Sequence, residues 1–151
     1  MSAPIATSAS HVHSAVHARC LWACLCLFLI RVIAQPLSLV TGASYLPDFE
    51  TWHSGALPYG ALLTSQILIL IVFVYMAWSV SAARITPRRR VGTLVLAGGA
   101  TYFAAMLARL VLGATVLSNH YWFARPLPTV FHLVLASFLL VYGHFHVRYG
   151  S

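Results

Sequence analysis

Residues 61 to 83 form a predominantly apolar segment without a single Asp, Glu, Lys or Arg. An α-helix rises about 1.5 Å per residue, so a segment of this length crosses a hydrocarbon core of about 30 Å. The chain as a whole is 60% hydrophobic and only 7% charged, whereas soluble domains carry roughly 25% charged residues. So little charge leaves too little polar surface for water. The sequence therefore predicts an integral membrane protein.

Four segments are long and apolar enough to cross a bilayer, at residues 21–40, 61–83, 91–117 and 129–147. Helices satisfy their own backbone hydrogen bonds within lipid, and segments of this length suit helices. Residues 1–18 are rich in Ala, Ser and His and lack apolar periodicity, so we expect a disordered cytoplasmic tail. The predicted fold class is all-α, an integral membrane four-helix bundle formed by residues 19–151.

A cleaved signal peptide is the alternative interpretation of residues 21–40. Arg19 precedes an apolar core that ends at Arg31, and residues 32–34 resemble a cleavage triplet. Arg31 between core and triplet, and Pro36 soon after, are atypical of signal peptides. Because residues 21–40 together reach the length that a bilayer requires, we favour a retained helix.

The placement of arginine predicts the orientation of the helices, since cytoplasmic loops are enriched in basic residues. The connector at residues 84–90 holds four of the nine arginines, and Arg19 and Arg148 flank the two ends of the chain. The opposite side has Arg125 and both acidic residues. We therefore expect both termini to be cytoplasmic, in a plasma or inner membrane.

The first connection, residues 41–60, is then extracytoplasmic, and it mixes aromatic residues with Pro and Gly. Such a composition suits the membrane–water interface. We expect a short interfacial helix over residues 47–53, with Pro47 in its first turn. This connection also contains Asp48 and Glu50, which are the only carboxylate side chains in the protein.

Polar residues within the spans should point into the bundle, because lipid does not solvate them. One predicted inward stripe is Cys24, Arg31, Gln35 and Ser38, and another is His132, Ala136, Leu139, Gly143 and His146. On the third span, Ala97, Thr101, Ala105, Arg109 and Gly113 recur every four residues and predict a seam for close helix approach. We expect these three stripes to face one another.

Arg31 and Arg109 are charged residues within spans, where each costs about 2.5–3.5 kcal/mol at the membrane centre on insertion scales. No acid lies in any span. We expect the outer connection to fold over the bundle, so that Asp48 and Glu50 pair with Arg109 and also with Arg31. The alternative is that each arginine reaches the lipid headgroups along its own side chain.

The predicted outer end gathers most of the polar chemistry of the membrane domain, and such a site in apolar walls is a default ligand pocket. Buried arginines suit an anionic or carbonyl-bearing ligand, such as a lipid headgroup or a quinone head. The alternative is that these groups only satisfy one another and hold the bundle together. The candidate ligand-binding residues are Arg31, Gln35, Asp48, Glu50, Trp52, His53, Gln66 and Arg109.

Histidines raise a second hypothesis, a metal- or haem-dependent redox protein. The metal candidates at the outer end are His53, His120 and His132, and imidazole suits zinc, copper and iron. At the inner end, His11, His13 and His17 precede the first span, and His144 and His146 end the last. For haem, His132 would need a partner such as His53 or His120, and His17 would have to face His146.

Sequence motifs of common enzyme classes are absent: the chain has no Walker loop, GxGxxG, HExxH or GxSxG. The scattered arginines do not indicate nucleic-acid binding. A small chain with four predicted membrane helices resembles the membrane anchor subunits of respiratory complexes. This likeness is one of shape and gives no residue a role. We therefore expect a non-catalytic subunit or ligand-binding module, in contact with the lipid bilayer and available for a homo-oligomer or a larger membrane complex.

Overall fold

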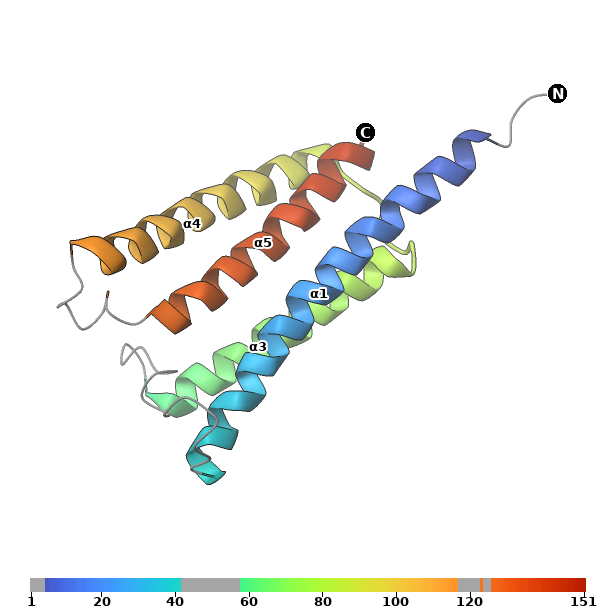
Figure 1. The fold of residues 1–151 in the computed structure, drawn as a ribbon. Helices are drawn as coiled ribbons and strands as arrows, with labels where there is room; N and C mark the ends of the chain where they lie inside the picture. Colours follow the sequence, from blue (N-terminus) through green and yellow to red (C-terminus); the bar gives the residue numbers. More distant parts are fainter. Residues whose placement is uncertain (1–4, 42–57, 117–122, 124–125) are drawn as a thin grey trace.

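The computed structural model describes residues 5–41, 58–116, 123 and 126–151, excluding the side chains of residues 5–14 and 41. Within these ranges all regular structure is helical, in α1 (Ile5–Thr41), α3 (Tyr59–Ser81), α4 (Arg89–Thr115) and α5 (Pro126–Tyr149) (Figure 1). Each of the four is long and apolar enough to cross a membrane. The predicted all-α, four-helix membrane fold is confirmed. The predicted interfacial helix at residues 47–53 lies outside the described residues.

The ends of the helices follow from proline and from the arginine run. α3 begins directly after Pro58, and α5 begins at Pro126, three residues earlier than predicted. Proline is favoured in a first helical turn, where its missing N–H would have no intrahelical partner. α4 begins at Arg89, within the basic connector. The last three spans therefore agree with the prediction, and their differences are confined to the first and last turns.

α1 begins well before its apolar span. Its backbone is helical from Ile5, although we expected residues 1–18 to lack regular structure, and its membrane-length part is Ala15–Val40. No glycine or proline occurs between Ile5 and Gln35, so nothing in the sequence stops the helix from extending backwards. The division of the chain into a tail and a membrane domain stays a prediction.

α5 is the centre of the packing. It packs against α4 on one side and α1 on the other, and α1 also packs against α3. Among the described helices, α4 packs on α5 alone, so the arrangement is more open than a square bundle. Leu21, Leu25 and Phe28 of α1 belong to the buried core. Phe73 of α3 stacks on Phe138 of α5 with ring centroids 3.9 Å apart.

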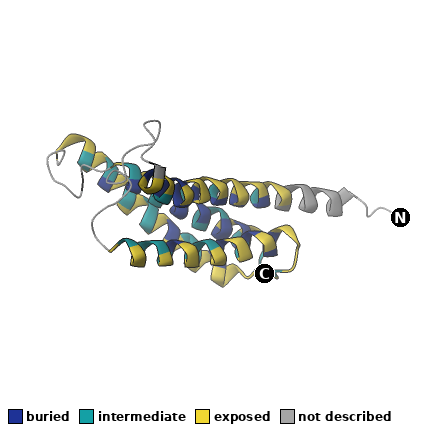
Figure 2. Ribbon diagram, turned by 90° about the horizontal axis from the view of Figure 1, so that it is seen from below, coloured by how far each residue is buried: buried dark blue, intermediate teal, exposed yellow. Residues whose placement is uncertain are grey.

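The surface that the bundle turns outward is apolar. Figure 2 shows buried residues between the helices and exposed residues on their outer sides. The exposed residues include Leu94, which is 75% exposed, and Ile71 and Leu68, which are both 62% exposed. A large exposed apolar surface is unfavourable in water and favourable in lipid. This pattern fits a protein surrounded by a bilayer.

Two of the three predicted inward stripes are confirmed. On α1, Arg31, Gln35 and Ser38 are buried and Cys24 is half-buried. On α5, Ala136, Gly143 and His146 are buried, while His132 and Leu139 are half-buried. The stripes do not all face one another, because α1 packs on α5 and not on α4.

The prediction that the stripe on α4 faces the other two stripes is wrong. Ala97, Thr101 and Ala105 are exposed, and of this stripe only Arg109 is buried and Gly113 half-buried. A helix has 3.6 residues per turn, so a stripe with a spacing of four drifts by about 40° at each step. Ala97 thus lies about 120° around the helix from Arg109, on the side that faces away from α5.

The true contact face of α4 repeats every seven residues. It combines Gly92, Gly99, Met106 and Gly113 with Val95, Tyr102 and Arg109, all of which are buried or half-buried. On α5, the buried Thr129, Ala136 and Gly143 repeat at the same interval. A spacing of seven drifts by only about 20° per step, so it keeps one face toward the partner.

Glycine is required where α4 and α5 cross. A Cβ atom on Gly143 would lie 2.7 Å from the backbone nitrogen of Leu96, and one on Gly92 would lie 2.6 Å from the backbone nitrogen of Val147. Small residues of this kind let helix backbones approach closely within a membrane. We call the contact made by Gly92, Gly99 and Gly143 the glycine seam.

Candidate functional site

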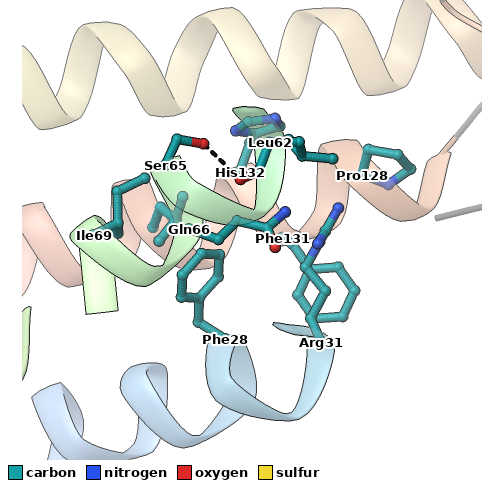
Figure 3. Close-up of a pocket in the computed structure, with 10 residues that line it drawn as sticks. Phe28, Arg31, Leu62, Ser65, Gln66, Ile69, Pro128, Phe131 and His132 are labelled. Atoms are coloured by element: carbon teal, nitrogen blue, oxygen red, sulfur yellow. Dashed lines mark hydrogen bonds between the residues drawn. The ribbon is translucent and has the colours of Figure 1, made fainter. Parts of the chain in front are cut away.

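A cavity of about 80 Å³ lies between α1, α3 and α5, in the half of the bundle where α5 begins. A site that holds one water needs roughly 10–15 Å³ by this measure, so the cavity has room for a small chemical group. Its walls are mainly apolar, with polar groups from each of the three helices (Figure 3). It is lined by Phe28, Arg31, Leu62, Ser65, Gln66, Ile69, Pro128, Phe131, His132 and Leu135.

Arg31 of α1 is the charged group in the wall of this cavity. Its side chain is 5% exposed, and Nη1 donates a hydrogen bond of 2.8 Å to Oε1 of Gln35, one helical turn later. The guanidinium also lies over the ring of Phe131, 5.6 Å from the ring centroid, in a cation–π contact. The i, i+4 spacing and the aromatic ring therefore hold Arg31 toward the cavity.

Gln66 of α3 faces Arg31 across the cavity, and Figure 3 shows both polar ends turned into the same space. Gln66 is 5% exposed, and within the described part of the chain its Oε1 atom is buried without a hydrogen-bond partner. Nε2 of the fully buried Gln35 also has no partner among those residues. A buried polar atom without a partner costs about 1–3 kcal/mol. Of these two groups only Gln66 lines the cavity, so the cavity presents an acceptor that a bound molecule would satisfy.

His132 connects the cavity to α4. It lines the cavity from α5, and its Nδ1 atom lies 2.5 Å from the hydroxyl of Tyr102. The positive charges of Arg109 and Arg31 both act on His132. Tyr102 was absent from the predicted site. It lies seven residues before Arg109 on the same face of α4, and this seven-residue spacing is the signal that would have identified it.

The structure therefore assembles part of the predicted ligand site. Arg31 and Gln66 line the cavity, Gln35 bonds to Arg31, and Arg109 lies near His132. The remaining predicted residues, Asp48, Glu50, Trp52, His53 and His120, lie outside the described residues. The pairing of the two acids with the two arginines stays a prediction for the same reason.

The inner histidines do not adopt the arrangement that a haem at this end would require. His17 does not face His146, because its Nε2 atom lies 2.9 Å from Nδ1 of His144. His146 is buried, and its Nδ1 atom instead accepts a hydrogen bond of 3.0 Å from the backbone N–H of Arg88. In the part of the chain that the structure covers, no three His, Cys, Asp or Glu residues gather to hold a metal ion. His132 is the one outer metal candidate inside that part.

Comparison of the chain with known protein families, with curated proteins and with solved structures found no match. The chemistry of the site is therefore argued from its own residues. Arg31 carries hydrogen-bond donors, Gln66 offers an acceptor, and the rings of Phe28 and Phe131 form an apolar wall. A few polar groups within apolar walls are the usual composition of a ligand pocket.

Proposed function

We propose that this small multi-pass membrane protein is a ligand-binding module. Its cavity holds the oxygen-bearing head of a molecule whose apolar tail lies in the bilayer. The observation that carries the proposal is the buried Oε1 atom of Gln66, which lies on the cavity wall opposite Arg31 without a partner among the described residues. A buried amide in such a position is costly unless something donates a hydrogen bond to it.

The chemistry of the wall narrows the class of ligand. Gln66 requires a hydroxyl or another donor, and the guanidinium of Arg31 on the opposite wall suits an oxygen acceptor. A head that combines a hydroxyl donor with further oxygen acceptors suits both groups. Quinols and hydroxyl-bearing phospholipid headgroups share this chemistry, and both carry apolar tails.

The exposed arginines indicate how the module is oriented in the membrane. Arg19, Arg84 and Arg148 are exposed at the end of the bundle opposite the cavity, together with the run at residues 88–90. Basic residues are enriched on the cytoplasmic side. We infer that both termini are cytoplasmic, in a plasma or inner membrane, and that the cavity lies in the outer half. A role as a non-catalytic subunit of a homo-oligomer or larger complex is the companion proposal.

The test is to identify what the protein retains when it is purified in a mild detergent. Organic extracts of the wild type, Gln66→Leu and Arg31→Met would be compared by mass spectrometry and by phosphorus content. A quinone enriched in the wild type alone would identify a redox lipid as ligand, and a phospholipid with the same behaviour would identify a membrane lipid.

Ser79→Ala is the matched control. Ser79 is also a buried polar residue of α3, but it lies outside the cavity wall and bonds to the backbone oxygen of Tyr75 on its own helix. The control should retain the same molecule as the wild type. A wild type without any enriched head-bearing molecule, or equal retention by Gln66→Leu, would overturn the proposal.

A further inference from the structure

α1 and α5 also contact each other at the end of the bundle opposite the cavity, through a pair of histidines. His17 of α1 and His144 of α5 are 127 positions apart in the sequence, yet Nε2 of His17 lies 2.9 Å from Nδ1 of His144. Their rings are nearly parallel, with an interplanar angle of 13°. Phe145 and Tyr149 pack against the ring of His17. The pair is therefore held by α5 on one side and remains exposed on the other.

A groove runs beside this pair. Its volume is about 340 Å³, and both histidines form part of its wall. Cys20, one helical turn after His17, lines the same groove, and the rest of the wall is aliphatic. Both imidazoles thus border a groove that is open to the outside of the bundle, which provides the entry path that an ion requires.

We propose that His17 and His144 bind a late first-row transition metal ion, such as Zn²⁺ or Cu²⁺, which links α1 to α5. Neutral imidazole is a common ligand for these ions. In a tetrahedral site with Zn–N bonds of about 2.0–2.1 Å, two ligand nitrogens lie about 3.3 Å apart. The facing nitrogens therefore need to separate by about 0.4 Å, and both rings must turn so that their lone pairs converge on the ion rather than on each other.

Binding of the ion leaves the number of protons on the two histidines unchanged. In the hydrogen-bonded pair, one facing nitrogen carries a proton and the other accepts it. When the ion binds both facing nitrogens, that proton moves to the other nitrogen of its own ring, and both imidazoles stay neutral. The pair contributes two ligands, and no third His, Cys, Asp or Glu within the described residues completes the set. The remaining positions belong to water or an external ligand, as in open metal sites.

The experiment uses the full-length, untagged protein in mild detergent, titrated with Co²⁺ and followed by visible absorption. Tetrahedral Co²⁺ absorbs strongly in this range, and Zn²⁺ should displace it. We expect one Co²⁺ per wild-type chain and loss of the signal in both His17→Gln and His144→Asn. These amides preserve a hydrogen bond across the pair, so melting without metal shows whether each variant is folded. Zn²⁺ should raise the melting temperature of the wild type alone.

The control is the double variant His11→Ala/His13→Ala, which removes the two other histidines near the start of α1. It should retain the Co²⁺ signal. Three outcomes would overturn the proposal: no stoichiometric ion in the wild type, a full signal in either His17→Gln or His144→Asn, or loss of the signal in the double control. The site lies at the opposite end from the cavity, so failure of this test leaves the ligand proposal intact.

Discussion

The two interfaces of α5 are built on opposite principles. Toward α4, glycines bring the helix backbones so close that a single added Cβ atom has no space. Toward α1 and α3, large side chains fill the interface, with the Phe73–Phe138 stack at its centre and the polar cavity at one end. Backbone contact leaves no room for a ligand, whereas side-chain packing leaves gaps that polar groups can line. This difference explains why the candidate site lies on one side of α5 only.

The comparison predicts that removing atoms damages the α1–α3–α5 interface most. Phe138 is fully buried against Phe73, and truncating a buried Phe to Ala costs about 3–5 kcal/mol. Phe138→Ala should therefore lower the free energy of unfolding by about that amount, measured by denaturant unfolding in detergent or bicelles. Leu94→Ala, at a residue that is 75% exposed, should leave stability almost unchanged. Equal loss in the two variants would contradict the assigned core.

Adding atoms should damage the glycine seam. Gly143→Ala places a Cβ atom 2.7 Å from the backbone nitrogen of Leu96, and overpacking of this kind costs about 1–3 kcal/mol. Gly98→Ala is the matched control, because nothing lies within 4 Å of the atom that it adds. The control should be neutral or stabilising by up to about 1 kcal/mol, since Ala favours helix. If the two substitutions shift the melting temperature alike, α4 and α5 are not in backbone contact.

The hydrogen bond between Tyr102 and His132 links the two interfaces, and its loss should have a smaller effect. Tyr102→Phe removes the hydroxyl that lies 2.5 Å from Nδ1 of His132. Interhelical hydrogen bonds in membranes average about 0.6 kcal/mol, with a maximum of about 1.7. Tyr75→Phe, at an exposed tyrosine on α3, should have no measurable effect on unfolding. A loss in Tyr102→Phe no greater than in Tyr75→Phe would show that the bond does not stabilise the bundle.

The smallest effect on stability is expected at Gln66, where function rather than folding should suffer. Gln66→Leu removes a buried acceptor that has no partner among the described residues, so the ligand-free protein should be as stable as the wild type or slightly more stable. The wild type should gain stability from added quinol or phospholipid, and the variant should not. A strong destabilisation of the ligand-free variant would instead show that Gln66 is a structural residue.

Much of the architecture can be predicted from the amino-acid sequence alone. The four spans are visible because hydropathy is a local property, and the polar stripes of Arg31, Gln35 and His146 point inward because lipid does not solvate them. Arg31, Gln35 and Gln66 were assigned to one site for the same reason, and the structure brings them together. The role of that site stays a proposal.

The rotation of α4 and the pairing of individual side chains were decided only by the tertiary structure. Small residues occur on more than one side of α4, and which side packs depends on where Gly143 and Ala136 lie on α5. The contacts of Tyr102 with His132 and of His17 with His144 depend on the same rotations. The physical reason is that a segment's own composition decides whether it forms a helix in lipid. The rotation of that helix about its axis depends instead on the shape of the helix that it packs against.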